Sequence, residues 1–284
     1  MPLSRSSARA RDRFPSDLSD QQWQQLAPLL LPPRSTRRGR PRRHSVRAIV
    51  NAIRYLVRTG CPWRYLPGCF PPWKTVYWYF HRWATEGTLH RAHAALRARV
   101  RAAQQRDPEP SAAIIDSQSV RGADTVPKST RGWDAGKKVN GRKRHIAVDV
   151  LGLVLAVVIT SANVQDRDAA KPLLARIAAA HWLLGLVWAD AGYAGKLESW
   201  AVEKLDIVLQ VVRKLPGQST FVVLPRRWVV ERSLAWISKH RRCVRDYERL
   251  PAHHEAMVLW ATTSHMLKRL TSSPNFPTVT NLDV

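Results

Sequence analysis

Acidic residues are scarce in this chain. Its 284 residues include 46 Lys and Arg but only 21 Asp and Glu, a formal net charge of +25, and the isoelectric point is near 11.2. This balance lies far outside the range of typical metabolic enzymes and favours a polyanionic partner. We expect that partner to be nucleic acid rather than a membrane surface.

Cysteine and long apolar runs are also scarce. The three cysteines (Cys61, Cys69 and Cys243) cannot form a disulfide framework, and no CxxC pair indicates zinc. The longest apolar run, Leu153–Ile159, has the length of a strand and is too short to span a bilayer. The first residues are charged but lack the apolar core of a signal peptide, so we expect a cytoplasmic location.

The positive charge is unevenly distributed. Residues 1–100 contain 19 basic and 4 acidic side chains, whereas the remainder contains 27 and 17. The length suffices for two ordinary domains, and the two prolines in Gln104–Pro110 indicate a boundary. The expected parts are a disordered arm over 1–16, a helical DNA-binding domain over 17–105, a second domain over 111–270 and a disordered tail over 271–284.

Amphipathic patterns predict four helices in the first third of the chain. Ser19 and Gln22 form a capping-box pattern at the first helix, and Ser45 caps the second. The third, Trp73–Trp83, is aromatic and basic, and the fourth covers about residues 88–105. This arrangement is typical of a helix-turn-helix-like DNA-binding domain, although some of the aromatic residues must form its core.

A segment without apolar residues, Arg34–His44, separates the first two helices. Such a charged segment is either a solvated linker or a DNA-binding arm. Its centre, Arg38-Gly39-Arg40-Pro41, has the Arg-Gly-Arg-Pro order with which AT-hook peptides enter minor grooves. We therefore favour an arm that contacts DNA through Arg38, Arg40, Arg42 and Arg43.

Two short apolar runs in the second domain each lead into an aspartate. Ala112–Ile115 precedes Asp116, and Leu186–Ala189 precedes Asp190. Continuous apolar runs of this length predict strands buried on both faces, where a carboxylate needs a partner or a metal. Either aspartate alone could simply cap a turn. Two such strands in one domain indicate two carboxylates that converge on one site.

The remaining patterns predict the order of the second domain. Asn140-Gly141 is a turn signal, so we expect a hairpin tip or strand edge bearing Lys137, Lys138, Arg142, Lys143 and Arg144. The elements expected after it are strands over His145–Asp149 and Leu153–Thr160, a helix around Ala170–Ile177, the Asp190 strand, a helix around Leu197–Lys204 and a strand over Asp206–Val212.

The last long helix is expected to begin near Arg226 and to contain Glu231. Arg227 and Glu231 are four residues apart and Ser238 returns to the same side, so the three form one polar stripe. An isolated pair of this kind is usually an ordinary helix salt bridge. Because most of the other sides of the helix are apolar, we expect a buried helix with Glu231 as a third candidate carboxylate.

Together these motifs resemble the DDE transposases of the bacterial insertion-sequence-five family. The resemblance covers residues from about 17 to 265. The segments that show it are Trp73–Phe80, Ile115–Ser117, Asp134–Lys138, Gly141–His145, Ala162–Asp168, Asp190–Tyr193 and the Glu231 helix. It implies an α/β fold in which an all-α helix-turn-helix-like domain precedes an RNase H-like mixed sheet with flanking helices.

The resemblance also implies the chemistry. The acidic triad would be Asp116, Asp190 and Glu231, which act as catalytic residues and as ligands of two Mg²⁺ ions, with Mn²⁺ able to substitute. The activity would be metal-dependent strand cleavage and strand transfer in DNA transposition. The implied partners are double-stranded DNA, as element ends and target, and a second copy of the chain at least. No membrane or small-molecule substrate is implied, and the protein would associate with the bacterial nucleoid when bound to DNA.

One family signature, Tyr-x2-Arg-x3-Glu-x6-Lys, is half present. Arg227 and Glu231 match it, but Leu224 occupies the Tyr position and Ser238 the Lys position. Lys239, Arg241 or Arg242 is expected to replace the missing lysine. The other residues expected to contact phosphates are Lys74, Lys137, Lys138, Arg142, Lys143, Arg144 and Arg227.

Two rival functions stay open at this point. A DNA-binding relic or repressor would retain end recognition without catalysis, but all three acids are present. A housekeeping RNase H-like nuclease would not need the basic N-terminal domain. The proposed chemistry does not require His145, which we interpret as a structural residue.

Overall fold

The architecture is a mixed sheet with helices on both faces, in a computed structural model that describes residues 14–31, 42–212 and 226–272. Most of the predicted N-terminal arm and C-terminal tail, together with Arg38, Arg40 and Leu224, lies outside these residues. The α-helices are α1 (Asp20–Leu30), α2 (Val46–Thr59), α3 (Trp73–Thr85), α4 (Thr88–Ala103), α5 (Asp166–Ala180), α6 (Lys196–Leu205), α7 (Arg227–Ser238) and α8 (Pro251–Thr271).

The predicted helix starts in the first third are confirmed. The Ser19 side chain accepts a hydrogen bond from the backbone of Gln22, whose side chain returns to Ser19 in a capping box. The Ser45 side chain caps α2 by accepting a hydrogen bond from the backbone of Ala48. Gly60 ends α2 in the left-handed conformation with φ 77°, which an L-residue with a side chain adopts only with strain.

Six strands form one sheet in the order β2-β3-β1-β5-β6, and β4 also pairs with β3. The contacts of β1 with β3 and of β3 with β4 are antiparallel, whereas those of β1 with β5 and of β5 with β6 are parallel. The strands are β1 (Ala112–Arg121), β2 (Gly132–Asp134), β3 (Val139–Asp149), β4 (Val154–Ser161), β5 (Leu186–Ala189) and β6 (Val208–Val211).

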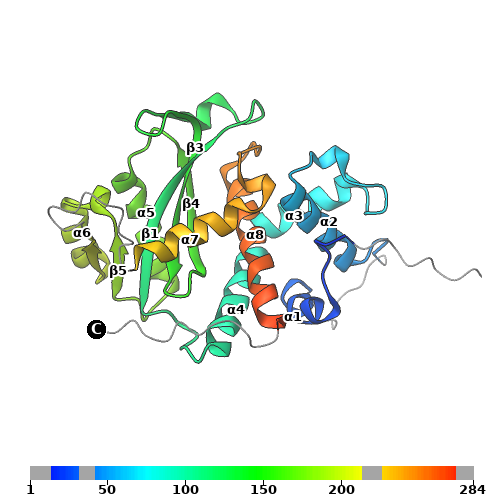
Figure 1. Ribbon diagram of the computed structural model, residues 1–284, viewed down its shortest axis with the longest axis horizontal. Coiled ribbons are helices and arrows are strands. Elements are labelled where there is room, and N and C mark those ends of the chain that lie inside the picture. Colours follow the sequence, from blue (N-terminus) through cyan, green and yellow to red (C-terminus); the bar gives the residue numbers. More distant parts are fainter. Residues whose placement is uncertain (1–13, 32–41, 213–225, 273–284) are drawn as a thin grey trace, which may run out of the picture.

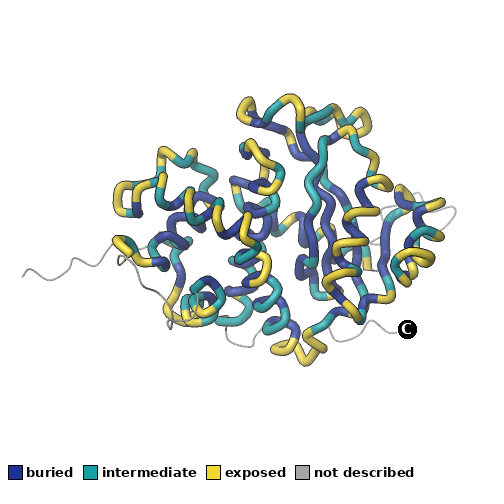
Figure 2. The backbone as a smooth tube through the Cα atoms, turned by 180° about the vertical axis from the view of Figure 1, so that it is seen from behind, coloured by how far each residue is buried: buried dark blue, intermediate teal, exposed yellow. Residues whose placement is uncertain are grey.

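The two faces of the sheet belong to two apolar clusters. Ala113, Ile115 and Ala147 pack with α5 and α6. Ile114 and Ile146 face the other way, into a cluster that also contains residues of α1 to α4, α7 and α8. Because neighbouring side chains of a strand point to opposite faces, Asp116 shares the α7 side with Ile114. Figure 2 shows the central strands as mostly buried.

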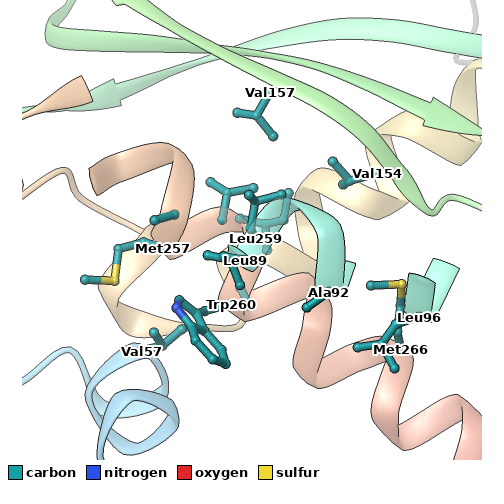
Figure 3. Packing of buried hydrophobic residues seen from close by; sticks show 14 of the residues in the cluster. Val57, Leu89, Ala92, Leu96, Val154, Val157, Met257, Leu259, Trp260 and Met266 are labelled. Carbon is teal, nitrogen blue, oxygen red and sulfur yellow. The ribbon is translucent and has the colours of Figure 1, made fainter. Parts of the chain in front are cut away.

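The longest helix, α8, was missing from the sequence prediction. The expectation that the Glu231 helix is the last long one is wrong, because α8 follows it with 21 residues. In the apolar cluster that includes α7 and α8, Trp260 of α8 lies beside Val57 of α2, and Met266 of α8 lies beside Leu96 of α4 (Figure 3). A helix buried on several sides has no clear amphipathic stripe, so its sequence lacks the pattern that predicts a helix.

The predicted hairpin is present, but its turn lies over residues 135–138, between the antiparallel β2 and β3, and not at Asn140-Gly141. Both residues lie inside β3, which continues without a turn from Val139 to Asp149. Gly141 is needed there for another reason: a Cβ on it would lie 2.0 Å from the carbonyl oxygen of Val120 on β1. The turn between β3 and β4 contains Gly152, in the left-handed conformation with φ 79°.

The described part of the chain contains no helix both long and apolar enough to cross a membrane.

Candidate active site

Two neighbouring parallel strands, β1 and β5, bring Asp116 and Asp190 together. Ile114 of β1 pairs with Trp188 of β5, so the same register continued by two residues places Asp116 level with Asp190. Asp116 lies within β1 and not beyond its end, which removes the turn-cap interpretation for this residue. Asp190 follows β5 directly and accepts a hydrogen bond of 2.8 Å from the backbone of Gly192.

The Asp116 carboxylate is poorly compensated. Burial raises its pKa to about 6, and the negative charge of Asp190 adds to this rise. The backbone N–H of Ser117 and the charges of Arg227 and Lys137 act in the opposite direction without cancelling it. A pair of carboxylates with excess negative charge favours the binding of a cation.

Glu231 is connected to the aspartate pair by Arg227, which contacts both Glu231 and Asp190. The Arg227 Nη2 atom lies 3.7 Å from Asp190 Oδ2 and 3.5 Å from Glu231 Oε1. Both contacts are longer than a good charge-assisted hydrogen bond, which is about 2.7–2.9 Å. The side chain of Glu231 is 52% exposed. The expectation that Glu231 lies on a buried face is therefore wrong, although other residues of α7, such as Val230 and Ile237, are buried.

The donor set of the site fits a divalent cation in part. Asp116 and Asp190 offer the hard oxygen ligands that Mg²⁺ prefers. Within the described ranges, no three His, Cys, Asp or Glu side chains lie close enough together to hold a metal ion. Arg227 contacts both Asp190 and Glu231 in this conformation. Glu231 would therefore join the aspartate pair as a ligand only if these contacts rearranged.

Two further residues near the pair had no role predicted from the sequence. Asp166, at the start of α5, accepts a hydrogen bond of 2.8 Å from the Ser117 hydroxyl and lies 3.1 Å from Lys143 Nζ. Burial, followed by the charges of Asp166, Asp116 and Asp190, raises the pKa of Tyr193 well above its ordinary value. Asp166 and Tyr193 both lie in motifs that carried the family resemblance, and this was the only signal for them.

The predicted phosphate-contacting cations divide into exposed and buried groups. Lys137 and Lys138 are exposed in the loop between β2 and β3. Arg142, in contrast, is fully buried and bonded to Asp246 at 2.9 Å. The exposed members elsewhere are Arg42, Arg43, Lys74 and Lys239.

Three other predicted contacts are enclosed by the protein. Lys143 is 6% exposed and close to Asp166. Arg242 is 7% exposed and lies 2.7 Å from Glu248. Arg144 is 1% exposed. The idea of a cationic strand edge is wrong for Lys143 and Arg144 in this conformation, because β3 pairs with β1 on one side and β4 on the other and so lies inside the sheet.

Arg144 contacts Ser238, the position at which this chain lacks the lysine of the family signature. Its guanidinium donates to Gln118 Oε1 on β1, to the carbonyl oxygen of Cys243 at 2.9 Å and to the Ser238 hydroxyl at 3.2 Å. The serine at the signature's Lys position therefore bonds to an arginine that comes from β3. This contact joins the end of α7 to β3, and the bond to Gln118 extends the link to β1, which carries Asp116.

The order of the sheet and its acidic pair define the class of the second half of the chain. Three antiparallel strands, a helix, and two further strands parallel to the first form an RNase H-like domain, with Asp116 and Asp190 on adjacent strands. Residues 107–267, more than half of the chain, match the family described as "Transposase DDE domain". Residues 18–93 match the family described as "Putative transposase of IS4/5 family". The chain belongs to the DDE transposases of the IS4/5 type.

Two proteins of Burkholderia cepacia are similar to parts of the chain. The first, "Putative transposase for insertion sequence element IS402", is 32% identical over 152 residues, which cover 51% of this chain and 69% of that protein. The second, "Insertion element IS402 uncharacterized 16.2 kDa protein", is 37% identical over 112 residues, which cover 37% of this chain and 72% of that protein. These similarities support a role in DNA transposition.

Proposed function

We propose that the protein binds the ends of an insertion element and carries out metal-dependent cleavage and strand transfer of DNA. The observation that carries the proposal is the pair Asp116 and Asp190, level on adjacent strands, with Asp116 buried and its pKa raised to about 6 by that burial and by the charge of Asp190. DDE transposase domains generally use divalent metal ions. Asp116, Asp190 and Glu231 are the proposed ligands.

The reaction needs an attacking oxygen and stabilisation of a leaving oxygen. In cleavage, a water oxygen bonds to phosphorus, the bond to the 3′ oxygen breaks, and the freed 3′ oxygen takes up a proton. In strand transfer, that 3′-hydroxyl oxygen bonds to the phosphorus of a target phosphodiester, the bond from phosphorus to the target's own 3′ oxygen breaks, and the proton lost by the attacking hydroxyl is balanced by the one that the departing oxygen takes up. Two Mg²⁺ ions, when bound, supply charge stabilisation at both oxygens.

Two cationic side chains, Lys137 and Arg227, lie where they can contact the phosphate that is to be cleaved. Lys137 is exposed, and its charge acts on Asp116, so it can pair with a phosphate oxygen beside the aspartates. Arg227 contacts Asp190 and Glu231 in this structure, and its planar guanidinium suits a phosphate. We assign both residues to substrate orientation.

The helical part offers a surface for element ends. Lys74, Trp78 and Arg82 are exposed and follow one another at four-residue intervals along α3, so they lie on one face of the helix. Trp78 is 50% exposed, with the Arg82 guanidinium 5.1 Å from its ring centroid. We propose that this face contacts duplex DNA, together with the exposed Arg42 and Arg43.

The division into a DNA-binding part over 17–105 and a catalytic part over 111–270 belongs to the same proposal. The two parts share an apolar cluster through α8, so they should move together when DNA binds. Bringing two element ends together requires at least two copies of the chain.

The test is an end-cleavage assay with DNA that carries the element, in the presence of Mg²⁺. Asp116→Asn, Asp190→Asn and Glu231→Gln each remove one ligand charge with little change of volume. Loss of about 3 kcal/mol of transition-state stabilisation lowers the rate by about 100-fold, since each 1.36 kcal/mol is tenfold. We expect at least that loss of nicked and joined products, with DNA binding retained.

The matched control is Glu203→Gln, which changes an exposed carboxylate on α6 in the same way. Cleavage by Glu231→Gln at the rate of the Glu203→Gln control would remove Glu231 from the triad. A wild-type protein that binds ends without nicking them would support the repressor alternative instead.

A further inference from the structure

A cavity of about 520 Å³ lies away from the aspartate pair, where α2, α7, α8 and the turn between β3 and β4 meet. Five cationic side chains contribute to its lining. They are Arg54, Arg58, Lys239, Lys268 and Arg269. No acidic side chain lines it among the described residues.

Few negative charges balance the positive charges that line the cavity. Within the described ranges, Arg58, Lys239, Lys268 and Arg269 form no ion pair, whereas exposed arginines elsewhere do, as in the 2.8 Å contact between Arg82 and Glu86. The overall excess of basic residues would scatter such cations over the surface. Their gathering around one cavity therefore calls for a local explanation.

The nearest acids do not neutralise the cavity. The charge of Asp17 acts on Arg54, yet burial still lowers the pKa of Arg54 to about 10. Asp149 acts on Arg269 but is bound to Arg101. Burial lowers the pKa of His265 to about 4, and the nearby charges of Arg269 and Lys268 act in the same direction.

The cavity has an ordered interior and a cationic entrance. Arg54 is 9% exposed and is fixed by hydrogen bonds to the carbonyl oxygen of Ser16 and to the Ser264 hydroxyl. The buried Nε2 atom of His265 has no partner in the described part of the chain. Lys239 and Lys268 are exposed, and neither makes a hydrogen bond through its ammonium group to a described residue.

We propose that this cavity binds backbone phosphates of the DNA on which the transposase acts. The inference rests on the proposed function, and it names a phosphate site at the junction of the helical part and the sheet. Lys239 follows Glu231 by eight residues on a nearly continuous helix, about 12 Å at 1.5 Å per residue. A duplex advances by this distance in three to four base pairs of about 3.4 Å. One strand can therefore pass from the triad to the cavity.

The experiment measures duplex binding by Lys239→Ala/Lys268→Ala in the full chain. A labelled duplex with the element end is titrated at several salt concentrations. Each phosphate that the protein no longer neutralises lowers the slope of log affinity against log salt by about 0.9, so the slope of the double variant should fall by about two units. The matched control, Lys196→Ala/Lys204→Ala, removes two exposed lysines from α6 and should keep the wild-type slope.

The outcomes separate this proposal from the catalytic one. An unchanged slope in Lys239→Ala/Lys268→Ala overturns the cavity as a DNA phosphate site, whether or not the wild type cleaves. A lowered slope supports it, even for a wild type without nicking activity. A titration with inorganic pyrophosphate distinguishes DNA from a free phosphate compound as the ligand of the cavity. Binding is measured by tryptophan fluorescence, because Trp236 lines the cavity. Saturable pyrophosphate binding that the double variant loses, with an unchanged DNA slope, assigns the cavity to a free phosphate ligand and overturns the proposal.

Discussion

The Nη2 atom of Arg144 donates a hydrogen bond of 3.2 Å to the Ser238 hydroxyl. Arg144 lies on β3 and Ser238 ends α7, so the bond joins the sheet to the helix that carries Glu231. The same guanidinium also bonds to Gln118, two residues beyond Asp116. Arg144 thus holds the two elements that carry two of the proposed catalytic acids.

We predict that Arg144→Met lowers the free energy of unfolding by about 3–5 kcal/mol, because it breaks a buried charged network and leaves its partners unsatisfied. Ser238→Ala removes only one of these bonds and should cost about 1 kcal/mol. Urea denaturation of both variants checks the prediction. Equal, small losses in the two variants would contradict it.

Divalent cations should stabilise the folded protein before any DNA is added. A cation bound between Asp116 and Asp190 offsets their repulsion, and a ligand at 100 times its Kd adds about 2.7 kcal/mol. We expect Mg²⁺ and Mn²⁺ to raise Tm in a thermal-shift measurement and Asp116→Asn to remove most of that rise. The control is Glu203→Gln, which should keep it.

Metal identity should also decide turnover. Mg²⁺ or Mn²⁺ should support end cleavage, whereas Ca²⁺ should allow assembly with little product, because it prefers looser and higher coordination. A chelator added in excess should abolish the reaction. Cleavage that persists under the chelator would exclude the metal-dependent mechanism.

Acid should destabilise the protein through buried histidines. Burial lowers the pKa of His145, His253 and His265 to about 4. In the unfolded chain these groups take up protons near pH 6.5. The stability that these histidines contribute by being neutral is therefore fully present above pH 6.5 and is lost as the pH falls towards 4. Asp116 acts with the opposite sign, because its raised pKa makes the folded state bind a proton first.

We predict that His253→Gln makes the stability less sensitive to pH between 6.5 and 4. One histidine contributes at most about 1.4 kcal/mol per pH unit to the slope of the unfolding free energy. Urea denaturation at several pH values measures it. His44→Gln, a change before α2 and outside the buried cluster, serves as the control. An unchanged slope in His253→Gln would contradict the prediction.

The arginine arm supports a prediction that depends on charge alone. Replacement of Arg38 and Arg40 with Ala should weaken duplex binding and lower the salt slope by about two units, because each neutralised phosphate accounts for about 0.9 of that slope. Preference for A·T-rich flanking sequence should fall as well if the arm enters the minor groove. Single-turnover cleavage at saturating DNA should persist, because the triad is unchanged. An unchanged slope would identify the segment as a solvated linker.

Local patterns were enough to predict most of the individual elements. The cap at Ser19 and the glycine end of α2 depend on neighbours within a few residues. The apolar runs before Asp116 and Asp190 likewise predicted buried strands, and the structure places both strands inside the sheet. The family resemblance then implied a mixed sheet, and the two strands that lead into aspartates predicted the pair, whereas the order of the strands came from the structure.

The tertiary structure decided which cationic side chains are buried and which are exposed. Arg142 and Lys137 look alike in the sequence, yet Arg142 is buried against Asp246 while Lys137 is exposed. The burial of a cation depends on whether distant segments bring a carboxylate and carbonyl oxygens to it, and no local pattern contains that information. The contacts of Arg227 with Asp190 and Glu231 arise in the same way. By itself the sequence determined which residues can do chemistry; packing determined which of them are free to meet DNA.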